Sequence, residues 1–196
     1  MKKKIRLGVN IDHAATLKQV RGGKTSYPDI LQIAEIAVQG GANLITIHLR
    51  EDRRHIQESD LQMLAQNLKV PLNLEMAATW DMVKKARKYR PEWCCFVPEK
   101  RQELTTEGGL NVLRDQIKIK KQVEKLHFIG IEASMFIEPS LKQVQAAYDV
   151  GADAIELHTG HWVTCHGRNK KKEWQRLVEA AKLAHHLGMG VHAGHG

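Results

Sequence analysis

Short apolar runs separated by amphipathic stretches recur along the whole chain. The clearest run, LITIHLR at residues 44–50, alternates apolar side chains with the polar Thr46, His48 and Arg50. Successive side chains of a strand point to opposite faces, so these three polar groups would share one face. A polar row inside a buried strand is costly unless something uses it. The pattern therefore predicts a strand with a functional face.

The same alternation of patterns predicts repeated strand and helix units. Predicted strands cover residues 5–12, 44–50, 72–76, 93–97, 129–137, 154–158 and 189–196. Predicted helices cover residues 30–38, about 59–68, 79–89, a segment ending near 123, 140–151 and about 174–187. Ser59 with Gln62 has the spacing of a capping box, and Thr79 is a suitable N-cap for the next helix. A Gly-rich linker around residues 21–23 follows the first strand.

Repeated strand and helix units predict an α/β fold with a parallel sheet, either open or closed into a barrel. Polar side chains near the end of almost every predicted strand favour a TIM (β/α)8 barrel, which gathers groups from many strands at one mouth. An open sheet concentrates function at one switch point, and no GxGxxG follows the first strand. We expect residues 1–196 to form one TIM-barrel domain. Only seven strands are readable, so the domain is expected to end early, without strand eight and its helix.

Composition narrows the class of protein. The 196 residues carry a net charge of +8, which suits nucleic acid, phosphorylated small molecules or acidic partners. No apolar run reaches the roughly 18 residues of a membrane span. Three cysteines do not make a disulfide framework, so a cytoplasmic protein is expected. Most of the eleven histidines lie near predicted strand ends, which favours chemistry over nucleic-acid binding.

Carboxylate and imidazole groups end four different predicted strands. A barrel would bring them together at one mouth, where they suit staged proton transfers. These candidate catalytic residues are His48, Glu75, Glu156 and His195. Side chains in or beside the loops of the same face could bind phosphate or hydroxyl groups: Arg21, Arg50, His55 and Thr105. The alternative for any one of them is an internal salt-bridge layer, although burying several charges without a use is expensive.

A metal site is the competing interpretation of the same chemistry. The possible ligands lie in two loops: His158, His161, Cys165 and His166 in one, and His192 with His195 in the other. No HExxH and no paired CxxC is present, so a metal is weakly supported. No lysine projects from the inner face of any predicted strand, which argues against an enzyme that forms a protein Schiff base.

Six segments together resemble the pyridoxine 5′-phosphate synthase family. They are GVNIDHAATL, HLREDRRHI, NLEMA, VPEKRQELTTEGGL, IELHTG and AGHG, and they follow in the family's order through the whole chain. The resemblance implies a TIM barrel with added helices that assembles as a homo-octamer. It also implies condensation of 1-deoxy-D-xylulose 5-phosphate with 3-amino-2-oxopropyl phosphate to pyridoxine 5′-phosphate, phosphate and water, with no metal or organic cofactor.

The resemblance also implies a role for each matching residue. It makes His48 and Glu75 proton acceptors and His195 a proton donor, with Glu156 stabilising charge in the transition state. The deoxyxylulose phosphate would be bound by Asp12, His13, Arg50, His55 and Thr105. Asn10, Arg21 and Gly196 would hold the aminoketone phosphate or close over the site.

The chain departs from the family pattern in two places. It has His192 where the family usually has Asn, and the family continues past AGHG through strand eight, whose Gly-His pair binds the aminoketone phosphate. A chain ending at Gly196 is therefore expected to lack that phosphate site and to lose activity. Two other functions stay open: another phosphate-handling TIM-barrel enzyme, such as a metal-assisted aldolase or isomerase, and an RNA-binding module using the basic segments 118–121 and 168–172.

Overall fold

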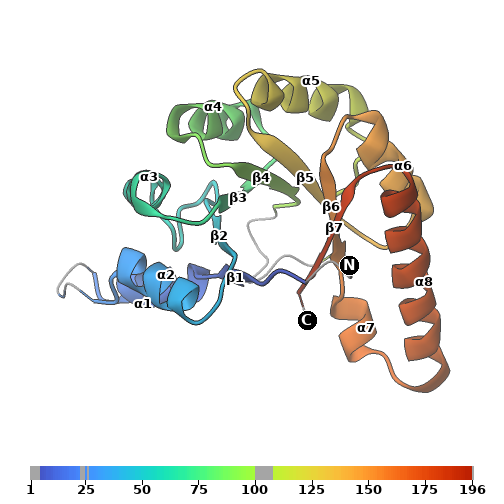
Figure 1. The fold of residues 1–196 in the computed structure, drawn as a ribbon, viewed down its shortest axis with the longest axis horizontal. Coiled ribbons are helices and arrows are strands. Elements are labelled where there is room, and N and C mark those ends of the chain that lie inside the picture. The colour runs from blue at the N-terminus through green and yellow to red at the C-terminus, as the bar shows by residue number, and fades with distance from the viewer. Residues whose placement is uncertain (1–4, 23–24, 26, 100–107, 196) are drawn as a thin grey trace.

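A single parallel sheet of seven strands forms the centre of the protein. The computed structural model describes residues 5–22, 25, 27–99 and 108–195. The strands lie side by side in chain order and the sheet curls, as the partial wall of a barrel would (Figure 1). They are β1 (Gly8–Asn10), β2 (Leu44–His48), β3 (Leu72–Ala77), β4 (Trp93–Val97), β5 (Glu132–Ile137), β6 (Ala154–His158) and β7 (Gly190–Gly194). This is the predicted TIM-barrel architecture with seven strands.

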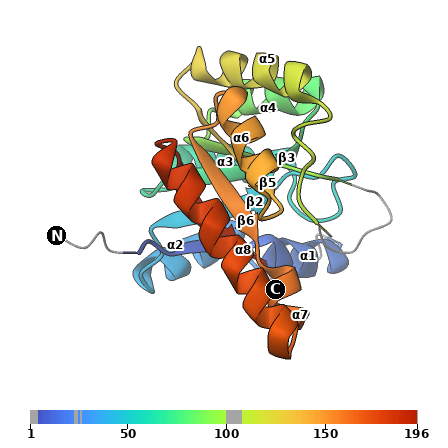
Figure 2. The same cartoon turned by 90° about the vertical axis from the view of Figure 1, so that its right-hand side faces the viewer.

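Helices follow the strands and cover the convex face of the sheet. They are α1 (Asp12–Val20), α2 (Ile30–Gln39), α3 (Glu58–Asn67), α4 (Trp80–Tyr89), α5 (Gln116–His127), α6 (Leu141–Asp149), α7 (Gly160–Thr164) and α8 (Gly167–His186). Helix α7 and the beginning of α8 extend beyond the end of the sheet (Figures 1 and 2). No helix of the described residues is both long and apolar enough to cross a membrane.

Two apolar clusters lie on opposite faces of the sheet. The main core lies between sheet and helices and includes the fully buried Ile45, Ile47 and Leu74, whose side chains point outward from their strands. A separate small cluster of Cys95, Val97 and Phe136 lies on the concave face. The main core supplies most of the buried apolar area that stabilises the fold. The concave face is therefore left for polar groups.

The hydrophobic pattern predicted most elements well. Strands β2, β3, β4 and β6 and helices α2 and α4 lie where the sequence placed them. Thr79 is the N-cap of α4, and its hydroxyl accepts a hydrogen bond from the Met82 backbone N–H at 3.4 Å. Observed β1, β5 and β7 are shorter than predicted because only part of each run pairs with a neighbouring strand.

The predicted capping box was wrong by two positions. Helix α3 begins at Glu58, with Gln57 as its N-cap, and the Gln57 backbone N–H donates to Asp60 Oδ2 at 3.0 Å. The other oxygen of Asp60 pairs with Lys18 Nζ at 2.6 Å. This long-range ion pair from α1 favours Asp60 over Gln62 as the acidic or amide residue of the capping box. Periodicity along one segment gives no information about such a contact.

Helices α1 and α7 and the first turns of α8 were not predicted from the sequence. Helix α1 begins immediately after β1 because Asn10 Oδ1 accepts a hydrogen bond from the Asp12 backbone N–H at 2.8 Å, turning the chain out of the sheet. Helix α8 begins at Gly167, seven residues before the predicted start at Trp174. Its first turns are basic and mostly exposed, so they carry no apolar periodicity from which a helix could be predicted.

Candidate active site

The concave face carries the predicted polar row of β2. Thr46, His48 and Arg50 are all buried, with 8%, 5% and 3% of their surface exposed. The register places His48 beside Glu75 on β3, and Asn73 Nδ2 donates to Thr46 Oγ1 at 3.3 Å. The inward face of β2 therefore continues as a polar face on the neighbouring strand.

Glu75 is the centre of a compact group of acids and imidazoles. It shares one group with Asp12 and His48 and a second with Glu156 and His195, and within each group one nitrogen or oxygen atom per residue lies within 4.8 Å of the others. His48 Nδ1 is 3.9 Å from Glu75 Oε2, and His195 Nε2 is 4.0 Å from Glu156 Oε1. The structure thus brings together all four predicted catalytic side chains, from β2, β3, β6 and the end of β7.

Burial and mutual repulsion shift the protonation of this group. Burial raises the pKa of Glu75 well above its usual range, and the nearby carboxylates of Glu156 and Asp12 raise it further. Burial also raises the pKa of Glu156 to about 7. The pKa of His195 is lowered by burial and by the neighbouring His158 and His48. A carboxyl group such as Glu156, which titrates near neutrality, is suited to proton transfer with the groups beside it.

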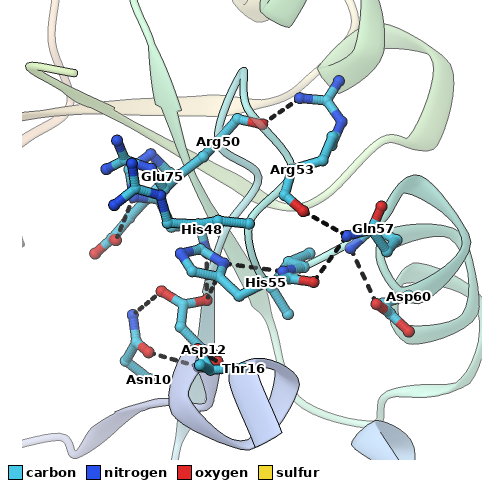
Figure 3. Close-up of polar contacts among 12 residues, drawn as sticks. Asn10, Asp12, Thr16, His48, Arg50, Arg53, His55, Gln57, Asp60 and Glu75 are labelled. Carbon is cyan, nitrogen blue, oxygen red and sulfur yellow. Dashed lines mark hydrogen bonds and ion pairs between the residues drawn. The ribbon is translucent and has the colours of Figure 1, made fainter. Parts of the chain in front are cut away.

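Asp12 connects the start of α1 to the end of β2. Its Oδ1 accepts a hydrogen bond from the His48 backbone N–H at 2.8 Å, and its Oδ2 accepts one from Asn10 Nδ2 at 2.9 Å (Figure 3). His55 Nδ1 lies 4.0 Å from Asp12 Oδ1, and its ring centroid is 6.0 Å from that of His48. Burial lowers the pKa of His55, which favours a neutral imidazole beside the cluster. Three of the predicted binding residues therefore surround His48.

Arg50 continues the polar face beyond the end of β2. Its Nε lies 3.3 Å from Asp52 Oδ1, while Arg54 pairs with the other oxygen of Asp52 at 2.7 Å. Although burial acts in the opposite direction, the hydrogen bonds from Arg54 and Arg50 lower the pKa of Asp52 to about 2. The loop after β2 is thus braced by its own charges, as expected for an arginine kept in position to bind an anion.

His13 and Arg21, two further predicted binding residues, lie apart from this cluster. His13 is exposed on α1, and Arg21 stacks on the Tyr27 ring, with its guanidinium carbon 4.6 Å from the ring centroid. Thr105 and Gly196 lie outside the described residues. The arrangement of the described chain therefore supports Asn10, Asp12, Arg50 and His55 as neighbours of the acidic group, whereas His13 and Arg21 lie outside it.

Several residues of the concave face were missed from the sequence. Glu99 Oε1 lies 3.4 Å from His48 Nε2, and Glu138 Oε1 lies 2.8 Å from His158 Nδ1. Phe136 packs against the His195 ring with 4.4 Å between centroids. Glu99 and Glu138 follow directly after β4 and β5, so their position at strand ends was the available signal. For Glu99 this signal was overlooked, because the residue stands at the start of a long polar segment after β4.

The end of β7 is fixed by contacts from the loop after β6. The Thr159 backbone N–H donates to the Gly194 carbonyl at 3.0 Å, and its hydroxyl donates to the same carbonyl at 2.8 Å and to the carbonyl of His195. A Cβ on Gly194 would lie 2.4 Å from Glu156 Oε1. A larger residue at position 194 would therefore displace the Glu156 carboxylate from its place in the site.

The two groups around Glu75 offer oxygen and nitrogen ligands that a divalent cation could take. The loop predicted as a metal site behaves differently: within the described residues, His158, His161, Cys165 and His166 form no such group. His158 is instead engaged by Glu138. Among the described residues, the groups that could hold a metal ion are therefore the two around Glu75.

Comparison with known proteins supports the resemblance seen in the sequence. Residues 7–196 match the family described as "Pyridoxal phosphate biosynthesis protein PdxJ". The chain is 64% identical over 196 residues to the pyridoxine 5′-phosphate synthase of Bdellovibrio bacteriovorus, covering 100% of this chain and 81% of that protein. It is 51% identical over 195 residues to the pyridoxine 5′-phosphate synthase of Coxiella burnetii, covering 98% and 80% respectively.

Solved structures with little sequence similarity share the fold. The HMG-CoA lyase of Bacillus subtilis superposes with a TM-score of 0.64 at 9% identity, covering 98% of this chain and 76% of that one. The YdjI aldolase of Escherichia coli K12 superposes with a TM-score of 0.56 at 14% identity, covering 97% and 74%. These two show the architecture alone, whereas the sequence matches over residues 7–196 are family-specific. The chain belongs to the PdxJ family of pyridoxal phosphate biosynthesis proteins.

Proposed function

We propose that this chain catalyses the synthesis of pyridoxine 5′-phosphate from 1-deoxy-D-xylulose 5-phosphate and 3-amino-2-oxopropyl phosphate, releasing phosphate and water. Its relatives carry the name of this activity. The observation that supports it best is the convergence of two imidazoles and two glutamates at one end of the sheet. Ring closure between an amine and a carbonyl compound needs repeated proton transfers, and these are the groups that perform them.

In this proposal the four central side chains divide the proton transfers. His48 and Glu75 accept protons, His195 donates one, and Glu156 stabilises charge in the transition state. The position of His195 at the end of β7, with its Nε2 4.0 Å from Glu156 Oε1, supports its role among the groups that exchange protons. The amine and ketone of the two substrates form the imine between themselves, so the reaction requires no protein lysine and no organic cofactor.

The substrate-binding roles follow the same division. Asp12, Arg50 and His55 would bind the deoxyxylulose phosphate, and Asn10 would bind the aminoketone phosphate. His13, Arg21, Thr105 and Gly196 stay in the proposal as binding residues on the strength of the resemblance. A net charge of +8 favours the approach of two phosphorylated substrates.

The assembly and location follow the family. We propose that the protein assembles as a homo-octamer, which the family resemblance supports. We also propose that it is located in the cytoplasm, which the low cysteine content supports. Analytical ultracentrifugation measures the assembly directly. A single species with the mass of one 22.2 kDa chain would contradict it.

The activity is tested by mixing the purified protein with both substrates and detecting pyridoxine 5′-phosphate by chromatography and absorbance. Glu75→Gln should abolish turnover while the circular dichroism spectrum stays unchanged, because the amide fills the same space but cannot accept the proton. Glu35→Gln, on the exposed side of α2, is the matched control and should retain full activity. Near-normal turnover of Glu75→Gln would exclude Glu75 as the base. Loss of wild-type activity on adding a chelator would favour a metal-assisted reaction.

A further inference from the structure

Glu99 is a buried carboxylate that none of the roles above uses. It follows β4, and its side chain reaches past the end of β3 to the end of β2. Both of its carboxylate oxygens accept the Glu51 backbone N–H at 3.1 Å. Only 6% of its side chain is exposed. The side chain is therefore held in one orientation by a contact 48 residues away in sequence.

The Glu99 carboxylate lies beside two residues of the proposed mechanism. Its Oε1 is 3.4 Å from His48 Nε2 and 3.8 Å from Arg50 Nε. Burial acts to raise the pKa of Glu99, but His48, the Glu51 backbone N–H and Arg50 outweigh it, so the pKa lies below the usual value. Glu99 is therefore a negative charge at neutral pH, placed against one edge of the His48 ring.

The opposite edge of the His48 ring faces the acidic cluster. Its Nδ1 lies 3.9 Å from Glu75 Oε2. A neutral imidazole carries hydrogen on one ring nitrogen and a lone pair on the other, and a carboxylate beside one nitrogen favours hydrogen there. With Glu99 beside Nε2, the lone pair belongs to Nδ1, where a proton can be accepted.

We propose that Glu99 is a positioning residue that holds hydrogen on Nε2 of His48 and so makes Nδ1 the proton-accepting atom. This inference rests on the proposed function, in which His48 accepts a proton from substrate. When the substrate bond to hydrogen breaks, its electron pair stays on the substrate and the proton joins Nδ1. The positive charge that forms on the ring lies next to the Glu99 carboxylate, which stabilises it.

Steady-state kinetics with both substrates test the catalytic part. Glu99→Gln should lower kcat by about 10- to 100-fold, the usual cost of losing a side chain that orients a functional histidine. KM should change far less than kcat. Glu51→Gln is the matched control, because Glu51 contacts Glu99 only through its backbone and its side chain is exposed. It should stay within about twofold of the wild type, as a surface substitution does.

A spectroscopic readout tests the contact without requiring turnover. In ¹⁵N spectra of histidine-labelled protein, with His48 assigned from His48→Gln, Nε2 should be protonated and Nδ1 bare at neutral pH. Glu99→Gln should change both His48 signals, because its amide can present N–H to the ring in place of an acceptor. Glu99→Asp keeps the charge but moves it away from the His48 ring by one methylene, so it should give an intermediate change in the His48 signals. This variant replaces Glu99→Gln in the test if Glu99→Gln does not fold.

Unchanged His48 signals in both variants would overturn the proposal, as would a kcat within about twofold of the wild type. An increase in KM with kcat unchanged would also overturn it, because it would show that Glu99 acts on substrate binding through Arg50 and not on proton transfer through His48. If the wild type forms no pyridoxine 5′-phosphate but its His48 signals still depend on Glu99, then the proposed function fails while the contact that orients His48 stands.

Discussion

At the scale of single residues, the unusual feature is the crowding of Asp12, Glu75 and Glu156. Three carboxyl groups at the end of a sheet cost folding free energy, because burial and repulsion disfavour their ionised forms. The same cost raises the pKa values of Glu75 and Glu156, and that of Glu156 reaches about 7, where the group can hold and release a proton. The burial and mutual repulsion of the carboxyl groups thus both lower the stability of the fold and tune these groups for proton transfer.

This cost predicts how the stability of the protein depends on pH. Folding raises the pKa of Glu156 from 4.5 to about 7. The folded state therefore binds a proton that the unfolded state releases, and the associated stability is present below pH 4.5 and lost as the pH rises through 7. A shift of this size corresponds to ~3 kcal/mol.

The prediction is checked by urea unfolding of the wild type and Glu156→Gln between pH 4.5 and 8. The free energy of unfolding of the wild type should fall over this range by more than that of the variant, since glutamine has no proton to lose. Glu35→Gln should follow the wild-type curve. Parallel curves for the wild type and Glu156→Gln would show that Glu156 does not titrate in this window.

At the scale of elements, the loop between β6 and α7 fixes the end of β7. The Thr159 hydroxyl contacts the carbonyls of both Gly194 and His195. His195 has a φ of 72°, a conformation that L-residues seldom adopt, so its backbone depends on such contacts. The orientation of the His195 imidazole is therefore controlled from a different element.

Thr159→Val should lower both stability and turnover. The valine keeps the shape but removes the hydroxyl, whose one hydrogen is shared between the two carbonyls and contributes about 1 kcal/mol, and it releases the backbone of His195. Thermal unfolding and kcat are the measurements. Thr164→Val is the control, because its hydroxyl bonds only to carbonyls of its own short helix. Equal kcat values for the two variants would contradict this role of Thr159.

At the scale of the whole molecule, the curled sheet separates two tasks. Its convex face packs on the helices and holds the main apolar core, while its concave face carries the site. Among the described residues, β1 and β7 each pair with a strand on one side only. Exposed apolar side chains accompany these edges: Ile5 at 93%, Leu7 at 55% and Val191 at 38% exposed. Such edges are sites at which strands of other chains can pair.

The edge on β7 predicts concentration-dependent association. Val191→Lys should reduce the growth of light scattering with protein concentration, because a charge on an edge strand disfavours pairing with another chain. Ile36→Lys changes a comparably exposed side chain on α2 and should leave the scattering as in the wild type. The same scattering for all three proteins would show that association does not use this edge.

The periodic parts of this structure could be predicted from sequence, and the long-range parts could not. His48 and Arg50 were predicted to share a buried face because alternation in one strand is a local property, and both are buried. The pairing of His48 with Glu75 and the closeness of Glu156 to His195 depend on the register of separate strands. A barrel implies such convergence without giving its distances or the resulting pKa shifts.

Glu99 shows why the rest of the site was missed. It lies in a polar loop with no hydrophobic period, and its partners are 48 to 51 residues earlier in the chain. Helix α1 was missed for a related reason, since one turn-forming contact between Asn10 and Asp12 sets its start. Contacts of this kind are specific to a folded geometry and leave no repeating pattern.

The way in which the site is assembled also has a consequence in time. Its side chains come from positions 12, 48, 75, 156 and 195, so the contacts between them join segments far apart in sequence. Such contacts form late in folding, because the loop between the two segments must be closed first. The group of Glu75, Glu156 and His195 is therefore expected to form only once β7 has paired with β6.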